Sequence, residues 1–292
     1  MTDLAPRELR ILLAVAETGG FTAAGTRLGL TQSAVSRAVA ATERRLGVAL
    51  FERDRAGARA TPAGERVLGH ARRALHALEA LAADARASAE TADRVAGPVR
   101  IAAFRSIAVQ LLPPVLARLR VRYPEVEPSV TVVADIGAGT AGEVAAGRAD
   151  LALATLGSDP PPGLVARPLL EETYALVHPA GHPEPRTLPL VDWAENCGSY
   201  TREWWALQDW LPTATVRAED DGTVLSLVAR GLGMAVMPEL SLSSLPAGLA
   251  VTDLGPDRPT RTIGYVTTPD AGPAVRAVVR ELRAAHRTRV SA

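Results

Sequence analysis

The chain has 292 residues, of which 47% are hydrophobic and 22% are charged, and its basic and acidic residues are equal in number. This composition is typical of a folded globular protein and excludes a disordered or fibrous chain, and a zero net charge argues against an indiscriminate nucleic-acid coat. The single cysteine, Cys197, excludes an internal disulfide and a multi-cysteine zinc site, and we expect no metal and no cofactor.

Targeting and membrane signals are not apparent. The first residues, Met1 to Arg7, lack a basic start followed by an apolar stretch. No run approaches the roughly 18 apolar residues that a membrane span requires. We therefore expect a cytoplasmic protein without a membrane partner.

Residues 4 to 60 alternate short helical patterns with tight turns. Gly29-Leu30 predicts a turn, and the hydroxyl of Thr31 can cap the helix that follows. An apolar stripe at spacings of four, three and four marks the inward face of that helix: Val35, Val39, Thr42 and Leu46. The opposite face has small and polar side chains: Gln32, Ser33, Ser36, Arg37 and Ala40. This pattern predicts a helix that enters the DNA major groove, although the fragment alone also fits an ordinary three-helix packing unit.

Two side chains of the outward face suit base edges. Gln32 can contact N6 and N7 of adenine, and Arg37 can reach O6 and N7 of guanine or a phosphate, each good base pairing contributing about 1–3 kcal/mol of discrimination. Downstream, residues 50 to 53 and 56 to 59 predict the two strands of a wing, in which Arg53 and Arg55 would lie along phosphates. Residues 1 to 61 hold nine arginines and six acidic residues, so this end of the neutral chain is basic.

A long helix is predicted over residues 62 to 94. Thr61 can cap it, and Pro62 suits the first helical position. Apolar residues then recur close to every 3.5 residues: Leu68, Ala71, Leu75, Leu78, Ala82 and Ala85. This spacing is typical of a coiled-coil seam between two copies, and the alternative is a helix that packs on its own domain.

The sequence pattern changes at Val95-Ala96-Gly97-Pro98, which marks a domain boundary. Short apolar segments then alternate with helical stretches, which predicts an α/β domain over residues 97 to 292. The expected strands are residues 99–103, 130–134, 151–155, 174–178, 234–237 and 263–267.

An ordered series of motifs resembles the LysR-type transcriptional regulators. In the N-terminal part the series comprises Leu9-Arg10, Gly20 to Ala24, Leu28, Thr31 to Arg37, Leu46-Gly47, Leu50 to Arg53 and Thr61 to Gly64. In the C-terminal part it comprises Val99 to Ala102, Leu111 to Pro113, Tyr123-Pro124, Gly147 to Leu153 and Leu227 to Pro238. Two positions in the N-terminal part depart from the family. Gly25 lies inside a helix, at a cost of roughly 1 kcal/mol, and Thr42 stands where leucine is usual, and both suggest a less stable domain.

The resemblance implies three parts: a mainly α winged helix-turn-helix DNA-binding domain (1–61), a linker and dimerisation helix (62–94), and an effector-binding domain (97–292). The last would be an α/β, two-lobed domain like a type 2 periplasmic binding protein, with two crossing strands. The family's linker helices pair antiparallel into a dimer, which reads a dyad-symmetric promoter site, and dimers assemble into a tetramer. A small-molecule co-inducer would then alter DNA bending and the access of RNA polymerase.

Segments at strand ends and helix starts would line the effector site between the lobes. The residues that we expect there are Arg105, Ser106, Asp135, Thr140, Tyr200, Thr201, Arg202 and Asp221. Arg105 and Arg202 suit a carboxylate, which suggests a small organic acid. Asp135 stands where the family commonly has glycine and would oppose an anion, so an amine-bearing or neutral ligand held by Asp135 and Asp221 stays open.

Four other functions are weighed. An enzyme could be imagined from Cys197, His178 and His182, but no acid or oxyanion element is placed beside them by motif. A transport solute-binding protein would share the C-terminal fold but not the N-terminal unit. A nucleoid-type architectural protein would bind DNA without sequence preference. The remaining alternative is a regulator that needs no effector.

Overall fold

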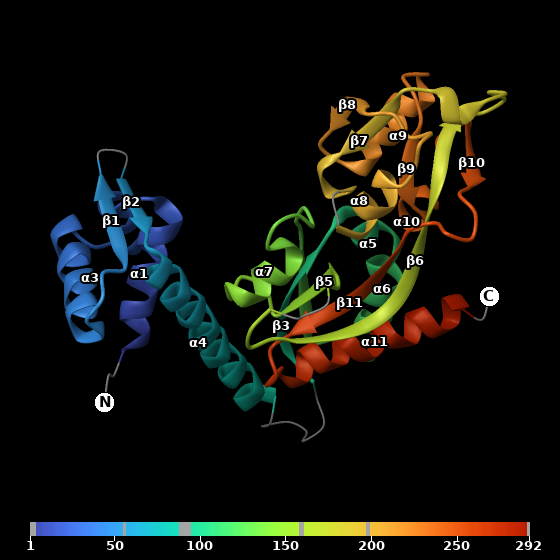
Figure 1. Ribbon diagram of the computed structural model, residues 1–292. Coiled ribbons are helices and arrows are strands. Elements are labelled where there is room, and N and C mark those ends of the chain that lie inside the picture. The colour runs from blue at the N-terminus through green and yellow to red at the C-terminus, as the bar shows by residue number, and fades with distance from the viewer. Residues whose placement is uncertain (1–3, 55–56, 88–94, 158–160, 197–198, 291–292) are drawn as a thin grey trace.

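The computed structural model describes residues 4–54, 57–87, 95–157, 161–196 and 199–290 (Figure 1). A small N-terminal domain and a larger two-lobed domain are joined by one long helix. The N-terminal elements are α1 (Pro6–Thr18), α2 (Phe21–Leu28), α3 (Gln32–Leu46), and a hairpin of β1 (Phe51–Asp54) and β2 (Gly57–Ala60).

The three helices and the hairpin close over one core, as the predicted inward stripe of α3 requires. Val35, Val39 and Thr42 are buried, and Leu46 packs at the edge of the same cluster. Thr42 is accommodated because its hydroxyl donates to the carbonyl of Ala38 at 3.0 Å. The carboxylate of Glu43 accepts from the backbone N–H of Leu50 at 2.8 Å, which fixes the hairpin to α3. The winged helix-turn-helix is thereby confirmed.

Gly25, which the sequence marks as a departure, lies where two backbones approach closely. The N–H of Leu30 donates to the carbonyl of Gly25 at 2.8 Å, as the chain turns from α2 toward α3. A Cβ atom at position 25 would lie 2.7 Å from the carbonyl oxygen of Leu30. Glycine is therefore required by the tight turn, and its cost in helix propensity is offset by that fit.

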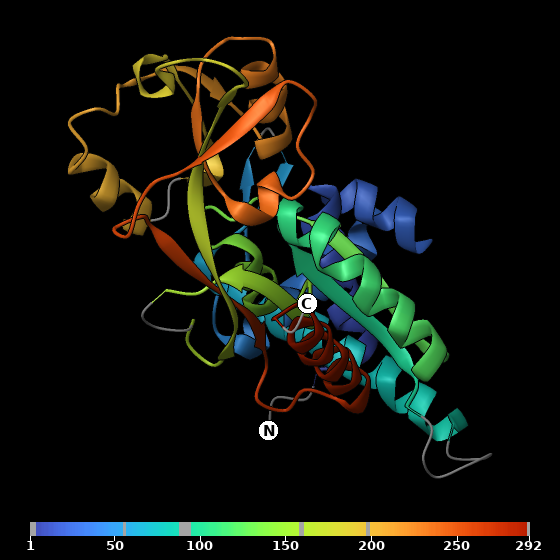
Figure 2. The same cartoon turned by 90° about the vertical axis from the view of Figure 1, so that its right-hand side faces the viewer.

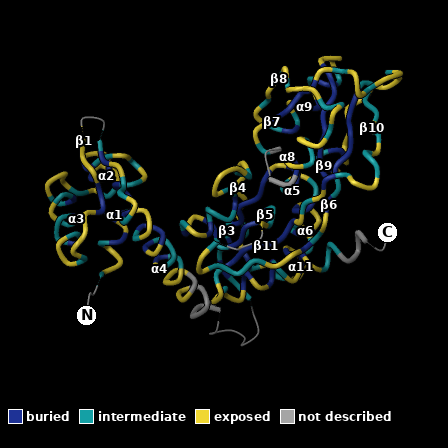
Figure 3. Tube along the Cα trace, in the orientation of Figure 1, coloured by how far each residue is buried: buried dark blue, intermediate teal, exposed yellow. Residues whose placement is uncertain are grey.

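The long helix α4 (Pro62–Ala87) begins where the sequence predicts, because the hydroxyl of Thr61 accepts from the N–H of Gly64 at 2.9 Å. Its first half packs on its own domain: Ala71 and Leu75 form a buried cluster with Leu9 of α1. In the second half, Leu78 and Leu81 are 44% and 66% exposed (Figure 3). The first half of the helix therefore packs within its own chain, which was the alternative to a coiled coil. Only the second half leaves apolar side chains exposed for a second copy.

The C-terminal domain contains two lobes, and β6 (Val165–Pro179) runs through both. Lobe I contains β3 (Gly97–Ala103), α5 (Arg105–Gln110), α6 (Leu112–Arg122), β4 (Val126–Val132), α7 (Gly139–Ala145), β5 (Leu151–Thr155), β11 (Thr260–Thr267) and α11 (Pro273–Val290). Lobe II contains η1 (Pro185–Thr187), β7 (Leu190–Trp193), η2 (Ala194–Asn196), α8 (Ser199–Ala206), β8 (Ala214–Ala218), α9 (Asp221–Ala229), β9 (Ala235–Pro238), α10 (Glu239–Leu242) and β10 (Leu249–Asp253).

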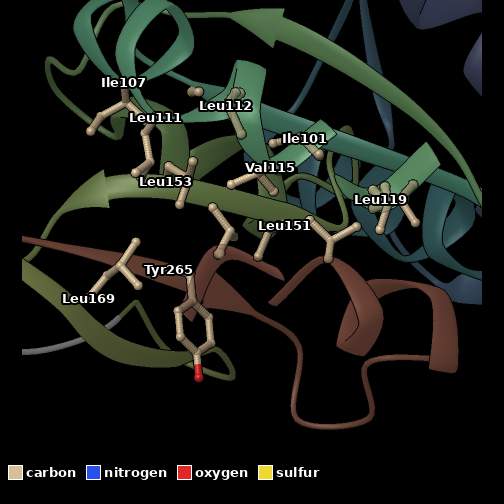
Figure 4. Packing of buried hydrophobic residues seen from close by; sticks show 14 of the residues in the cluster. Ile101, Ile107, Leu111, Leu112, Val115, Leu119, Leu151, Leu153, Leu169 and Tyr265 are labelled. Carbon is tan, nitrogen blue, oxygen red and sulfur yellow. The ribbon is translucent and has the colours of Figure 1, made fainter. Parts of the chain in front are cut away.

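The main sheet is mixed, with strand order β10-β6-β11-β5-β3-β4 and with β9 also paired to β6. Strand β3 is parallel to β4 and β5, whereas β11 is antiparallel to β5 and β6. Helices α6 and α11 lie together on one side of lobe I (Figure 2), where Arg118 of α6 reaches Glu281 of α11 at 2.9 Å. Side chains of β3, β5, α5 and α6 pack into the largest core (Figure 4). The two-lobed α/β expectation is confirmed.

Helix α4 docks on lobe I at the C-terminal end of α7. Arg72 and Arg73 donate from α4 to the carbonyls of Ala146 and Ala145, at 3.1 and 2.7 Å. The backbones almost touch, because a Cβ on Gly147 would lie 2.5 Å from the carbonyl oxygen of Gly69.

Asp150 completes this contact from lobe I. Its carboxylate lies 3.1 Å from Nε2 of His76 on α4 and accepts from Nη2 of Arg100 on β3 at 2.7 Å. Burial alone would raise the pKa of Asp150, but the hydrogen bonds from His76 and Arg100 lower it to about 2. The carboxylate is therefore charged at neutral pH and joins α4 to the sheet.

We predict that Gly25→Ala lowers the free energy of unfolding of the N-terminal domain by about 1–3 kcal/mol, because the new methyl group meets a backbone oxygen. Gly20→Ala is the matched control: Gly20 has φ −171°, and a Cβ there meets nothing within 4 Å. We expect this control to cost less than about 1 kcal/mol. Chemical denaturation followed by circular dichroism measures both, and equal losses would contradict the packing account.

Candidate DNA-binding interface and effector site

The N-terminal end of α3 is exposed and capped. The hydroxyl of Thr31 accepts from the N–H of Ala34 at 3.2 Å and lies 3.1 Å from the Ser33 hydroxyl. Gln32, Ser33 and Arg37 are exposed, and Ser36 is half-buried. Nε of Arg37 donates to the carbonyl of Ser33 at 3.3 Å, and its terminal nitrogens have no partner among the described residues. The predicted outward face is therefore accessible, with one cation directed along it.

Arg53 of the hairpin is held against this face. Its Nη1 donates to the hydroxyl of Ser36 at 3.3 Å, and its guanidinium lies 4.0 Å from the ring centre of Phe21. The side chain that we expected along phosphates therefore also braces β1 against α2 and α3. Arg59 on β2 is exposed, and Arg55 lies outside the described residues.

Arg105, the first residue of α5 in lobe I, reaches across to lobe II. Its Nη1 donates to the carboxylate of Asp221 at 2.6 Å, and Asp221 also accepts from the hydroxyl of Ser241 at 2.6 Å. The guanidinium lies against Gly222, where a Cβ would be 2.5 Å from Nη2. An effector carboxylate would therefore have to displace Asp221 or use the remaining donors of the Arg105 guanidinium, whose side chain is 45% exposed.

Asp135 and Thr140 anchor the start of α7 to β5. The carboxylate of Asp135 accepts from the N–H of Thr155 at 3.0 Å, and the fully buried Thr140 donates to the carbonyl of Leu153 at 2.9 Å. Both side chains thus have partners within lobe I, and their contact with an effector stays a prediction.

The other predicted effector residues are either buried or have side chains outside the described part of the structure. Ser106 and Thr201 are 5% and 3% exposed, so any effector contact would need them uncovered. The side chains of Tyr200 and Arg202 lie outside the described part of the structure, as does Cys197. Arg105 is paired with Asp221, and the side chain of Arg202 lies outside the described residues, so the organic-acid hypothesis stays a prediction.

Glu195 is an interlobe residue that the sequence does not mark. It lies in η2, and the backbone N–H of Asp135 in lobe I offers its carboxylate a hydrogen bond. Burial, reinforced by the negative charges of Asp221 and Asp135, raises the pKa of Glu195 to about 7. Carboxyl groups from both lobes therefore lie close together here.

Arg261 is a second such residue. Its Nε donates to Glu172 at 2.7 Å, and its guanidinium lies 4.9 Å from the ring centre of Phe104. The side chain is 11% exposed, and Nη2 is buried without a partner among the described residues. A buried donor left unpaired costs about 1–3 kcal/mol, so Nη2 is available to an acceptor atom. No local motif around position 261 signals this role.

Two kinds of feature are absent from the part of the chain that the structure describes. No group of three or more His, Cys, Asp or Glu side chains there could hold a metal ion. No helix within the same residues combines the length and the apolar character needed to cross a membrane.

The raised pKa of Glu195 predicts how stability depends on pH. The folded protein holds this proton up to about pH 7, whereas the group's ordinary pKa is 4.5. Stability should therefore fall as pH rises from 4.5 to 7, and Glu195→Gln should remove that fall. The four tryptophans lie between residues 193 and 210, so their fluorescence reports the unfolding of lobe II.

We expect the melting temperature of Glu195→Gln, relative to that of the parent chain, to rise from pH 5 to about pH 7 and to level off above it. Glu184→Gln, at an exposed position in the same lobe, is the control and should follow the parent. A constant difference between Glu195→Gln and the parent across this range would refute the titration.

Two family models match the chain, one over each of its domains. Residues 6–65 match the model of the bacterial regulatory helix-turn-helix protein, lysR family, and residues 92–287 match the LysR substrate binding domain. The probable HTH-type transcriptional regulator LrrA of Synechococcus elongatus is 35% identical over 267 residues, covering 85% of each chain.

Solved structures show the same fold. A full-length OxyR variant from Pseudomonas aeruginosa superimposes with a TM-score of 0.69 at 23% identity, over 98% of this chain and 95% of that one. Full-length CbnR in complex with its target DNA gives a TM-score of 0.67 at 22% identity, over 97% and 100%. With a helix-turn-helix model and a substrate-binding-domain model matched in order along it, the chain belongs to the LysR family of transcriptional regulators.

Proposed function

We propose that this chain regulates transcription by placing α3 in the major groove of a dyad-symmetric promoter site. The observation that carries the proposal is the capped, exposed face of α3 with Arg37 on it and Arg53 bracing the hairpin beside it. The complex of CbnR with its target DNA supports duplex DNA as the partner of this fold.

The second half of α4 supports self-association. Leu78 and Leu81 project from a helix whose first half is already packed, so they are available to a second copy. A symmetric pair of α4 helices would present two α3 helices to two half-sites. We propose that such dimers assemble into a tetramer and that the regulator acts on the access of RNA polymerase.

The proposal includes no enzymatic step. Nε2 of His178 lies 2.9 Å from the hydroxyl of Thr252, and Nδ1 lies 3.0 Å from the carbonyl of Pro179, so both ring nitrogens have partners. A buried histidine in such a setting supports a structural role on β6 rather than that of a general base.

DNase I footprinting on the region upstream of the protein's own gene tests the DNA-binding proposal. We expect a defined, dyad-symmetric footprint. Arg37→Ala should weaken binding by about 1–3 kcal/mol and relax preference at one base pair, whereas Arg59→Ala should weaken all sequences alike and reduce the salt slope by about 1. Binding that depends on salt but not on sequence would favour the architectural alternative.

We propose that α7 transmits the state of the interlobe region to the DNA-binding domain. Its start is anchored beside Asp135, and its last carbonyls accept from Arg72 and Arg73 of α4. At 1.5 Å per residue, this helix spans roughly 10 Å as one rigid element. A ligand that moves lobe II against Asp135 would therefore shift α4 and the domain attached to it.

Substitution at the contact of α7 with α4 tests this route. In Gly147→Ala the new methyl group would meet the carbonyl of Gly69, so we expect a changed footprint length or DNA bend angle. Gly181→Ala is the matched control, because Gly181 shares the left-handed backbone, at φ 77° against 66°, with nothing within 4 Å. Identical DNA geometry in the parent and Gly147→Ala, or an equal change in Gly181→Ala, would exclude transmission through this contact.

A further inference from the structure

A cavity of about 570 Å³ lies in lobe I, away from the residues that join the two lobes. Its walls come from the start of β6, the end of β11 and one side of α11. Arg167 and Tyr265 stand opposite each other on paired strands and form its floor. Figure 4 shows the ring of Tyr265 extending from the core, with its hydroxyl at the far end.

Four arginines line this cavity, and the only acidic residue among the described lining residues is Asp270. Arg280 donates to the hydroxyl of Tyr123 at 2.6 Å, and Arg283 donates to the hydroxyl of Tyr265 at 2.5 Å. Arg276 donates to the carbonyl of Ala271, and Arg167 to that of Ala166. These neutral acceptors orient the guanidinium groups without neutralising them.

Several other arginines of the domain are paired with acidic residues. Ion pairs join Arg100 to Asp150, Arg118 to Glu281, Arg148 to Glu143, and Arg261 to Glu172. In the described structure none of the four cavity arginines has such a pair. Arg276, Arg280 and Arg283 follow one another at spacings of four and three on α11, where like charges repel. Although the chain has zero net charge, this concave surface carries a local excess of positive charge. A bound anion would reduce the repulsion between these arginines.

We propose that this cavity binds a small organic anion with two or more negative charges, such as a phosphate ester or a polycarboxylate. The guanidinium groups supply paired donors for its oxygens, and Val165, Val275 and Val279 supply an apolar wall for its carbon skeleton. We do not propose the duplex DNA bound by α3 as the occupant, because α11 lies beneath lobe I and away from α3 (Figure 1). The site does not depend on the proposed interlobe effector.

Isothermal titration of the full chain with pyrophosphate and with citrate, at low ionic strength, tests the proposal. We expect saturable binding of at least one probe, with one site per chain, and a rise in melting temperature with probe concentration. In Arg276→Ala/Arg280→Ala the affinity should fall at least tenfold. The probe that binds more tightly identifies phosphate or carboxylate as the preferred group.

The control is Arg120→Ala/Arg217→Ala, which removes two exposed arginines that lie in the same domain but outside the cavity. Its affinity should stay within twofold of the parent. Arg276→Gln/Arg280→Gln keeps the side-chain bulk and should behave like the alanine pair, which separates charge from misfolding. Saturable binding of neither probe, or equal affinity in the parent and both cavity variants, overturns the proposal. So does a cavity variant that changes only the oligomeric mass, because the surface would then be an interface between copies.

Discussion

The contact between Gly69 of α4 and Gly147 of lobe I is the constraint on which the arrangement of the two halves depends. Neither residue tolerates a side chain without moving a backbone, and a Cβ on Gly69 would itself lie 3.2 Å from the carbonyl of Ala145. Around this point Arg72 and Arg73 satisfy carbonyls at the end of α7, and His76 meets Asp150. Close backbone approach permits these polar contacts, and they in turn hold the linker helix on the sheet.

Asp150 connects this contact to the central sheet. One carboxylate serves the backbone and the guanidinium of Arg100 on β3, together with His76 on α4. Strand β3 lies between its two parallel neighbours, β4 and β5. Just after β3 ends, Arg105 begins α5 and pairs with Asp221 of lobe II. The linker helix and the interlobe ion pair are thus attached to opposite ends of one short segment. In the proposed coupling, a change in the angle between lobes would reach α4 through this segment as well as through α7.

Helices and strands with one buried face, or with a continuous apolar run, were predictable from the spacing of apolar residues in the sequence. The stripe of Val35, Val39 and Thr42, the cap at Thr31 and the strand 151–155 are examples, because burial on one face imposes spacing. The strands β7, β8 and β10 were not predicted. Strand β7 is buried but only four residues long, β8 alternates half-buried and exposed residues, and β10, at the edge of its sheet, has half-buried and exposed residues only. The expected strand at 130–134 lies instead at Val126–Val132, beginning just after the turn at Tyr123-Pro124. Short, partly exposed strands have little hydrophobic contrast, so tertiary pairing decides them.

The candidate site was predictable only in part, for a related reason. The sequence brings Arg105 and Asp221 to the same region through strand ends, but it does not show that they pair with each other across 116 positions. Glu195 and Arg261 acquire their properties from neighbours distant in the chain, Asp135 and Glu172. The Gly69–Gly147 approach likewise joins two ordinary glycines, and only the folded backbone distinguishes them from the others.

Coupling between binding sites is reciprocal, so the central claim can be tested without knowing the effector. If α4 and α7 transmit one state of the protein, DNA that engages α3 must alter lobe I. Hydrogen–deuterium exchange of the full chain, with and without promoter DNA, measures this directly. We expect changed protection at residues 139–150, in addition to any change in α3. Exchange in that segment that is identical with and without DNA would contradict the coupling.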